Sequence, residues 1–314
     1  MTISVPQDGR LRLLSYRGAG GDPRIGAALA DGSVLDIADA ASAAGIKLGF
    51  DPSSMISLIE SGSAGLDAVR KLAASGGRNK LTLAEKQFLP PIPRLTKNIY
   101  CVGWNYVEHF QEGAEFRADP NLKLPEHPVF FSKGVNSLNG PFDPVPYDTN
   151  VSNRVDWEVE LAVVIGKKGR NISEAGAMGH VFGYTVLNDT SAREVQQKKH
   201  GGQWFKGKSI DGHAPMGPWI VPAGDLDPSN LRLLCRINGE VRQDGSTRQM
   251  YFKVPRIIAE LSLGLTLEPG DVIATGTPPG VGFAMKPPQY LKPGDIMESE
   301  IEEIGAIRNT IAAV

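Results

Sequence analysis

The chain has 314 residues, enough for one large domain or for a core domain with a smaller module. Its 33 Lys and Arg against 35 Asp and Glu exclude the basic surface of a nucleic-acid-binding protein, and no apolar run reaches the ~18 residues that a membrane-spanning helix needs. The 36 Gly and 23 Pro indicate many tight turns and short elements, which excludes a bundle of long helices.

The N-terminal part of the chain is predicted to form a small α+β module. Its first residues lack the charged and apolar segments of a secretion signal, so we expect a cytoplasmic location. Gly-Asp-Pro and Asp-Gly turns separate three predicted strands, over residues 11–16, 25–30 and 33–37. Apolar residues at helical spacing then predict helices over 54–61 and 66–74.

A Pro-rich segment at residues 89–93 predicts the boundary between this small N-terminal domain (1–93) and a second domain (94–314). We expect the second domain to be mainly β, with antiparallel pairing and few helices. Asn238-Gly239 predicts a tight hairpin there, because a type I′ turn needs positive φ at both central residues. The other strand-like segments are 97–102, 129–132, 158–165, 181–188 and 231–237.

The two cysteines, Cys101 and Cys235, are 134 positions apart. They are too few for a disulfide framework and too far apart for a thiolate zinc site. We therefore expect two reduced, buried thiols that behave as small apolar side chains.

Glu158 and Glu160 lie in an otherwise apolar, β-branched segment. In a strand, the period of two places both carboxylates on one face, where they repel each other unless a cation lies between them. Asp189, at the end of the next strand-like segment, offers a third carboxylate. Three carboxylates suit Mg²⁺ or Mn²⁺ better than zinc. The alternative from the pattern alone is a strand with a polar outer face and a helix-capping Asp.

Several other polar side chains are candidates for catalysis or binding. His109 and Glu112 lie three apart on a predicted short helix, so the carboxylate could orient the imidazole as a base that deprotonates water. The alternative is a solvated pair on a surface helix. Lys133 ends an apolar strand, Lys208 lies in a Gly/Ser-flanked turn, and either could simply be solvated. Arg193, on a helix predicted over 191–200, could line a pocket or lie on an exposed face.

Residues 156–166 and 183–193 closely resemble the corresponding motifs of the fumarylacetoacetate hydrolase family. The resemblance implies a mixed β-roll catalytic domain after a smaller N-terminal domain, usually in a homodimer. It extends over roughly residues 97–314. The further matching motifs, in order, are 206–209, 216–219, 238–240, 269–278 and 294–295.

The resemblance also implies roles for particular residues. It assigns the metal ion to Glu158, Glu160 and Asp189. It places His109 and Glu112 on a lid that closes over the substrate.

The remaining residues implied by the resemblance surround the substrate. Lys133 and Lys208 belong to the active site. Gln243 is expected to donate to the substrate, and Thr277 to lie near the substrate carboxylate.

These residues predict an enzyme that acts on a small-molecule 2-oxo acid. We expect hydrolysis of a C–C bond in an acylpyruvate, with water activated by His109 and with pyruvate, or an analogous keto acid, and a carboxylic acid as products. The alternative is a decarboxylase, isomerase or hydratase of 2-oxo acids in aromatic catabolism. A further alternative is that the chain is a metal-binding, non-catalytic protein with the same fold. Gly134 stands where the family often has Pro after the first lysine, which leaves the substrate preference open.

Overall fold

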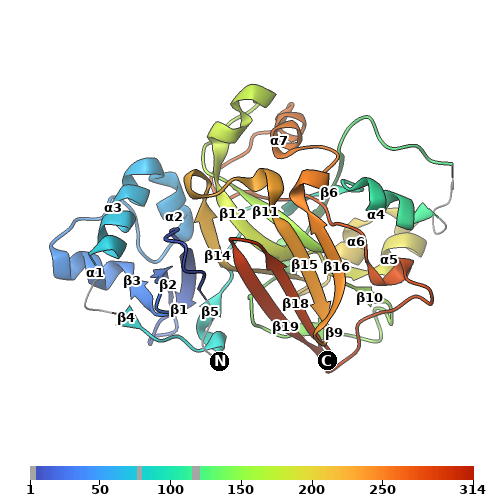
Figure 1. Cartoon of the computed structure of the whole chain (residues 1–314), viewed down its shortest axis with the longest axis horizontal. Helices are drawn as coiled ribbons and strands as arrows, with labels where there is room; N and C mark the ends of the chain where they lie inside the picture. The colour runs from blue at the N-terminus through green and yellow to red at the C-terminus, as the bar shows by residue number, and fades with distance from the viewer. Residues whose placement is uncertain (1–4, 76–79, 115–120) are drawn as a thin grey trace.

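The computed structural model describes residues 5–75, 80–114 and 121–314. A 12-stranded and a five-stranded β-sheet form the centre of the structure, and the helices lie around them (Figure 1). The predicted fold class, mainly β with a mixed β-roll, is therefore confirmed. Among the described residues, no helix has the length and apolar character needed to cross a membrane.

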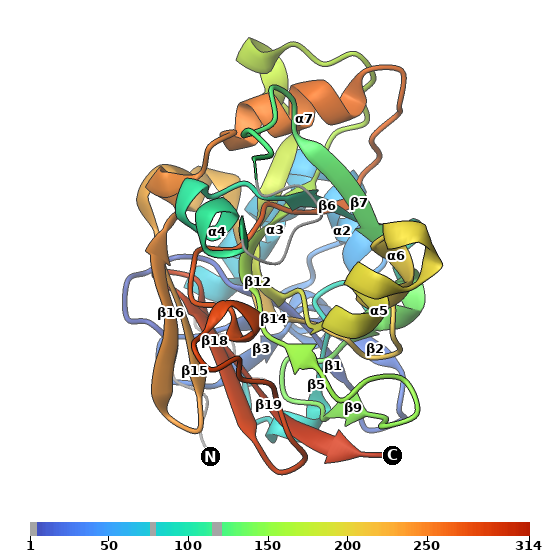
Figure 2. The same cartoon turned by 90° about the vertical axis from the view of Figure 1, so that its right-hand side faces the viewer.

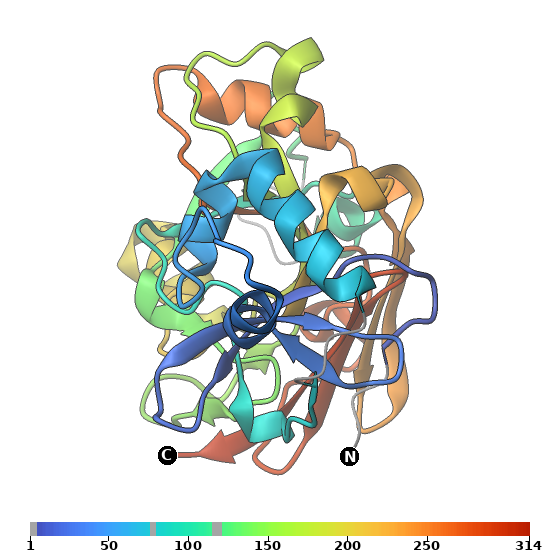
Figure 3. The same cartoon turned by 90° about the vertical axis from the view of Figure 1, so that its left-hand side faces the viewer.

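The N-terminal module consists of a small antiparallel sheet with helices on its outer side (Figure 3). One helix was not predicted: Asp36 ends a strand, and its side chain accepts a hydrogen bond from Asp39 N, so a helix begins at Ile37. The predicted strands and helices are present, with bounds shifted by a few residues. The elements are β1 (Leu13–Arg17), β2 (Pro23–Ala28), β3 (Val34–Asp36), α1 (Ile37–Ala44), α2 (Met55–Glu60), α3 (Gly62–Ala74) and β4 (Lys80–Leu81).

The sheet of this module continues into the rest of the chain. β1 pairs with β14 (Ala214–Pro222) through Leu13 and Ile220, which joins both parts into one 12-stranded sheet. A single hydrophobic cluster also contains buried residues from both sides of the predicted boundary, for example Leu13 and Ile99. β5 (Phe88–Leu89), at the Pro-rich segment, pairs with β1. The boundary at 89–93 stays a prediction, and the two parts pack as one structure.

The central strands of the large sheet carry the site. β11, in which all residues are buried, pairs antiparallel with β12 on one side and with β17 on the other. Four of the five strands of this region agree with the predicted segments to within two residues, since apolar, β-branched runs fit a sheet covered on both faces. The exception is β17, which was not among the predicted strands. The bounds of the five strands are β6 (Ile99–Gly103), β7 (Val129–Lys133), β11 (Val159–Ile165), β12 (Val181–Asn188) and β17 (Val272–Ala274).

A second, five-stranded sheet closes the roll (Figure 2). The hairpin predicted at Asn238-Gly239 is confirmed, with φ of 54° and 81° at the two residues. The strands are β9 (Val145–Tyr147), β15 (Arg232–Ile237), β16 (Glu240–Ser246), β18 (Ile296–Ile301) and β19 (Gly305–Ala313). Short strands complete the set: β8 (Leu138–Asn139), β10 (Val155–Asp156) and β13 (Ser191–Ala192).

The helices of the second domain are short. α4, α5 and α6 lie together at the end of the roll away from the N-terminal module (Figure 1). They are α4 (Val107–Glu112), α5 (Arg193–Lys198), α6 (Phe205–Lys208) and α7 (Val254–Ser262). The helix predicted over 191–200 is therefore shorter than expected. Cys101 and Cys235 are free and buried, as predicted.

Candidate active site

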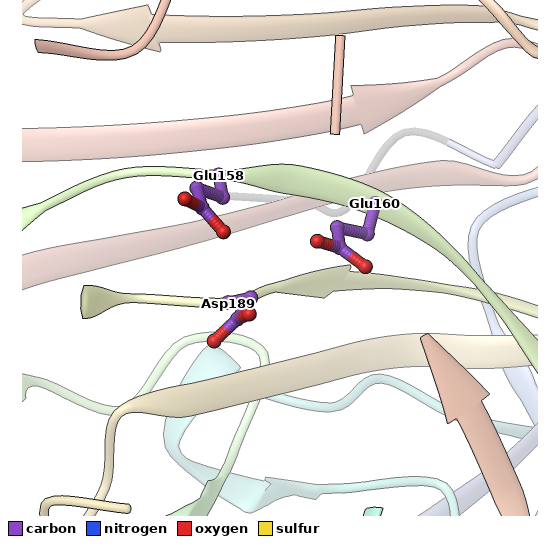
Figure 4. A group of neighbouring side chains, drawn as sticks. All are labelled: Glu158, Glu160 and Asp189. Carbon is purple, nitrogen blue, oxygen red and sulfur yellow. The ribbon is translucent and has the colours of Figure 1, made fainter. Parts of the chain in front are cut away.

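The three predicted metal ligands converge. The register of β11 and β12 sets Val159 opposite Asn188, which brings the residue before β11 next to the residue after β12. Asp189 N donates to Glu158 O at 2.8 Å. One carboxylate oxygen each of Glu158, Glu160 and Asp189 lies within 4.8 Å of the others, and all three side chains are buried (Figure 4). A solvated strand face, the alternative from the pattern, is therefore wrong.

Three buried cations surround two of these carboxylates. Lys208 Nζ lies 2.6 Å from Glu158 Oε2 and 2.7 Å from Asp189 Oδ2. Lys133 Nζ donates to Asp189 Oδ1 at 2.8 Å. Arg193 Nη2 lies 2.7 Å from Glu158 Oε1, an ion pair without hydrogen-bond alignment. Lys133, Lys208 and Arg193 are all buried, so the predicted alternatives of solvated lysines and an exposed arginine are wrong. The carboxylate partners offset the cost of burying these charges.

Glu160 differs from the other two carboxylates. No lysine or arginine in the described part of the chain forms an ion pair with it, and its Oε2 accepts from Gly276 N at 2.8 Å. Burial, together with the charges of Asp189 and Glu158, raises the pKa of Glu160 well above its ordinary value. Burial also disfavours ionised Glu158, but the nearby cations outweigh it and lower the pKa of Glu158.

This donor set fits a hard divalent cation. Three carboxylates offer oxygen ligands, and one of them, Glu160, forms no ion pair with a cationic side chain among the described residues. Mg²⁺ and Mn²⁺ favour such oxygen-rich sites, whereas zinc favours His and Cys. Glu158, Glu160 and Asp189 are the residues that would hold the ion.

Lys133 has a supporting position rather than a catalytic one. It is fully buried, donates to Asp189 Oδ1 and to Thr190 O, and does not line the cavity described below. The resemblance implied a place for Lys133 in the active site; in the structure it contacts Asp189 there without reaching the cavity. Its ammonium instead holds Asp189 in place.

We expect Lys133→Met to lower the free energy of unfolding of the EDTA-treated protein by about 3–5 kcal/mol, since it breaks a buried ion pair and leaves a charge behind. Urea denaturation measures this loss. Lys168→Met is the matched control, because Lys168 pairs with Glu268 at the surface, where such a pair contributes about 1 kcal/mol or less. Equal losses in the two variants would contradict the supporting role of Lys133.

His109 and Glu112 form a hydrogen-bonded pair on α4. His109 Nδ1 lies 2.7 Å from Glu112 Oε1, and Glu112 Oε2 accepts from Gly280 N at 2.8 Å. His109 is only 8% exposed and lines the cavity, so the solvated-pair alternative is wrong. With Nδ1 bonded to Glu112, Nε2 remains for proton transfer, the arrangement that a general base needs.

A cavity of about 360 Å³ lies above the triad. Gln196, which lines it, was absent from the predicted site. It accepts from Arg193 Nη1 at 3.1 Å, and its position three residues after Arg193 on one helix face was the signal that could have revealed it. The polar lining residues are His109, Glu158, Glu160, Arg193, Gln196, Gln197, Lys208 and Thr277, and the larger apolar ones are Val102, Trp104, Leu122, Phe131, Trp204 and Phe283.

Gln243 does not have its predicted role as a donor to the substrate. Its Nε2 donates to Thr277 Oγ1 at 2.7 Å and to Pro278 O at 2.8 Å, and its Oε1 accepts from Val159 N at 2.9 Å. The amide therefore fixes the start of β11 beside the triad. Thr277 lines the cavity, and its hydroxyl donates to Val159 O, so its contact with a substrate carboxylate stays a prediction.

One loop, residues 276–283, binds carboxylates through its backbone. Gly276 N donates to Glu160, and Gly280 N donates to Glu112 at 2.8 Å. The loop thus contacts both the triad and the His-bearing helix. It sets the position of the His109/Glu112 pair relative to the carboxylate triad.

Asp156 anchors the far end of this loop. It accepts from Gly282 N at 2.7 Å and from Phe283 N at 3.0 Å. Its Oδ2 also accepts from Arg193 Nε at 2.7 Å. Asp156, to which sequence analysis assigned no role, therefore holds Arg193 and the loop together.

We expect Gly280→Ala to disturb the loop. Gly280 has a φ of 103°, and an added Cβ would lie 2.0 Å from Arg242 O, so the backbone must move away from Glu112. The free energy of unfolding should fall by about 2–3 kcal/mol, measured by thermal denaturation. Gly294→Ala controls for the dihedral strain alone, because Gly294 has a φ of 93° with nothing within 4 Å of the added Cβ. A loss no larger than that of the control would count against a fixed loop.

Comparison with known proteins agrees with this geometry. The family model described as "Fumarylacetoacetate (FAA) hydrolase C-terminal" matches residues 98–312. A mitochondrial oxaloacetate tautomerase of Homo sapiens is 46% identical over 261 residues, which cover 83% of this chain and 80% of that protein. An oxaloacetate tautomerase of Bacillus subtilis is 43% identical over 269 residues, covering 83% and 87%. The solved fumarylacetoacetate hydrolase of psychrophilic Exiguobacterium antarcticum superimposes with a TM-score of 0.80 at 36% identity, covering 97% of this chain and 100% of that one. The chain therefore belongs to the fumarylacetoacetate hydrolase family.

Proposed function

We propose that this protein is a divalent-metal-dependent enzyme that interconverts the keto and enol forms of a small 2-oxo acid, with oxaloacetate as the first candidate. The observation that carries the proposal is that two members of the buried carboxylate triad, Glu158 and Glu160, line the same cavity as His109, whose partner is Glu112. The identities of 46% and 43% to oxaloacetate tautomerases support this substrate. They favour the isomerase alternative of the sequence analysis over acylpyruvate hydrolysis.

The reaction requires a proton to leave C3 of the substrate and a proton to reach the 2-oxo oxygen. A divalent ion held by the triad, Mg²⁺ or Mn²⁺, would stabilise the negative charge that develops on that oxygen. His109 Nε2 takes the C3 proton, and Glu112 stabilises the imidazolium through Nδ1. The same imidazolium returns a proton to the oxygen, so no other acid is needed.

The other charged groups of the site hold these parts in place. Lys208 bridges Glu158 and Asp189 and holds the two carboxylates next to each other. Arg193 fixes Glu158 from the opposite side. The ligand oxygens are thus positioned before any ion binds, which lowers the reorganisation needed for binding.

The test follows the enol absorbance of oxaloacetate with Mg²⁺ or Mn²⁺ and with EDTA. We expect the enzyme to accelerate ketonisation above the buffer rate, to lose this activity in EDTA and to regain it with either ion. Pyruvate release is measured in the same samples, because it reports decarboxylation instead. Unchanged ketonisation rates at all enzyme concentrations, with either ion, would reject the tautomerase proposal.

A second candidate is the hydrolysis of an acylpyruvate. The His/Glu pair favours it, because a base that takes a proton from carbon can also take one from water. Loss of the diketone absorbance of acetylpyruvate, with one acetate formed per pyruvate, would identify this activity.

We also propose a homodimer and a cytoplasmic location. Light scattering should give twice the mass of one chain, and cell fractionation should recover the protein with cytoplasmic markers. A monomeric mass, or recovery with an organelle, would contradict the corresponding proposal.

A further inference from the structure

Three aromatic side chains form one side of the cavity, here called the aromatic wall: Trp104, Phe131 and Trp204. The ring centroids of Trp104 and Trp204 lie 5.0 Å apart, and those of Phe131 and Trp204 lie 5.2 Å apart, both edge to face. All three side chains keep part of their surface accessible. Apolar rings left accessible in a cavity beside catalytic groups indicate a binding surface for an apolar part of a ligand.

The backbone is shaped to place these rings. Trp104 has a φ of 57°, in the left-handed region that a bulky residue seldom adopts. Trp204 packs on Gly103, where a Cβ would lie 2.4 Å from its ring. Such strain persists where the surrounding structure holds it, which occurs most often at functional sites.

The charges near the wall are already balanced. In the described ranges, the Lys and Arg side chains that line the cavity are Lys208 and Arg193. Lys208 is held by Glu158 and Asp189, and Arg193 by Glu158 and Asp156. A charged group long enough to reach the wall would therefore meet apolar rings and, among the described residues, no unpaired Lys or Arg, which is unfavourable; the C4 carboxylate of oxaloacetate is too short to reach the rings. An uncharged planar group fits there better.

We propose that the cavity also accepts 2-oxo acids with an aryl group on C3, and that the enzyme tautomerises them. The 2-oxo and carboxylate groups lie at the triad, and the aryl ring packs against the aromatic wall. One proton moves from C3 to the 2-oxo oxygen through His109, and no bond of the carbon skeleton breaks. This inference rests on the proposed tautomerase chemistry and extends its substrate class. The volume of about 360 Å³ is within the range of pockets that bind small organic ligands.

The probe is phenylpyruvate, and oxaloacetate is the comparison substrate. Wild-type enzyme with Mg²⁺ should bind phenylpyruvate in a calorimetric titration and accelerate its keto–enol exchange. In Trp204→Ala, kcat/KM and affinity for phenylpyruvate should fall by about tenfold more than for oxaloacetate, since the short substrate does not reach the ring. If Trp204→Ala does not fold, Phe131→Leu is the second variant, because it keeps an apolar side chain. It should lower the ratio of kcat/KM for phenylpyruvate to that for oxaloacetate by about threefold.

The control variant is Phe205→Ala. Phe205 follows Trp204, is 48% exposed and does not line the cavity, so its loss should leave the ratio of the two substrates unchanged. Equal losses for both substrates in Trp204→Ala, or phenylpyruvate that neither binds nor reacts while oxaloacetate does, would overturn the inference. Reaction of phenylpyruvate without reaction of oxaloacetate would instead overturn oxaloacetate as the substrate and support the aromatic wall.

Discussion

Glu160→Gln is expected to abolish metal binding and to lower kcat/KM by roughly 10³-fold or more, because the variant loses several kcal/mol of charge stabilisation by the ion. The amide is nearly the same size as the carboxylate, and its oxygen can still accept from Gly276 N. The change therefore removes charge with little change in shape. Calorimetric titration with Mg²⁺ and Mn²⁺ should give heat with the wild type and none with the variant.

The same substitution should stabilise the metal-free protein. Burial and the charges of Asp189 and Glu158 raise the pKa of Glu160, so the folded state holds its proton more tightly than the unfolded state. The free energy of unfolding of the wild type in EDTA then falls as pH rises from the ordinary Glu pKa, about 4.3, toward the raised one. Glu160→Gln has no carboxyl group at this position and lacks this decrease. At pH values above the ordinary Glu pKa, its Tm in EDTA should therefore be higher than that of the wild type.

Glu160→Gln is thus expected to lose metal binding and yet to gain stability in EDTA, and this combination makes the prediction specific. A substitution that merely damaged the fold would lower both the Tm and the metal affinity. Glu268→Gln is the matched control, because Glu268 is a partly exposed carboxylate paired with Lys97 and Lys168 at the surface. It should leave metal binding unchanged. Undiminished titration heat in Glu160→Gln would remove this residue from the ligand set.

His109→Gln should lower kcat by about 10²–10⁴-fold, the range associated with a general acid–base group. The amide can still donate to Glu112 but cannot carry a proton between carbon and oxygen. Metal affinity should stay within about twofold, since His109 is not one of the three ligands. Stopped-flow measurement of ketonisation and calorimetry on the same sample test both parts.

The control for this variant lies on the same helix. Glu108 is exposed on α4 and is not among the cavity-lining residues, so Glu108→Gln should keep wild-type kcat. A loss of kcat in Glu108→Gln as large as that in His109→Gln would contradict the specific role of His109.

Local patterns predicted most of the sheet. Runs such as 181–188 consist mainly of apolar, aromatic and β-branched residues over the length of a buried strand, so composition alone locates β12. The helix beginning at Ile37 was missed, because its capping Asp36 also ends a strand and the apolar pattern continues across it. The pairing of β1 with β14 could not be predicted from the sequence, because the two strands are about 200 residues apart and no local pattern indicates their register.

In the site, too, local spacing predicted some residues correctly, whereas roles that depend on contacts between distant segments were missed. The spacing of Glu158 and Glu160 predicted a shared face because the strand period decides it, and the structure brings Asp189 to them. Gln243 was misassigned, because its function depends on which backbone groups lie around it after folding. Asp156 was overlooked for the same reason, since its partners come from a loop about 125 residues later.

The loop over residues 276–283 has a consequence for how the protein tolerates mutation. Its contacts with Glu160, Glu112 and Asp156 are made by peptide N–H groups, which every residue except proline supplies. Pro279 is the one non-glycine residue of this segment that keeps accessible surface, so other side chains should be tolerated there. Deleting or inserting one residue would instead shift every later amide out of register with its carboxylate, so a change in the length of this segment should disrupt all three contacts at once.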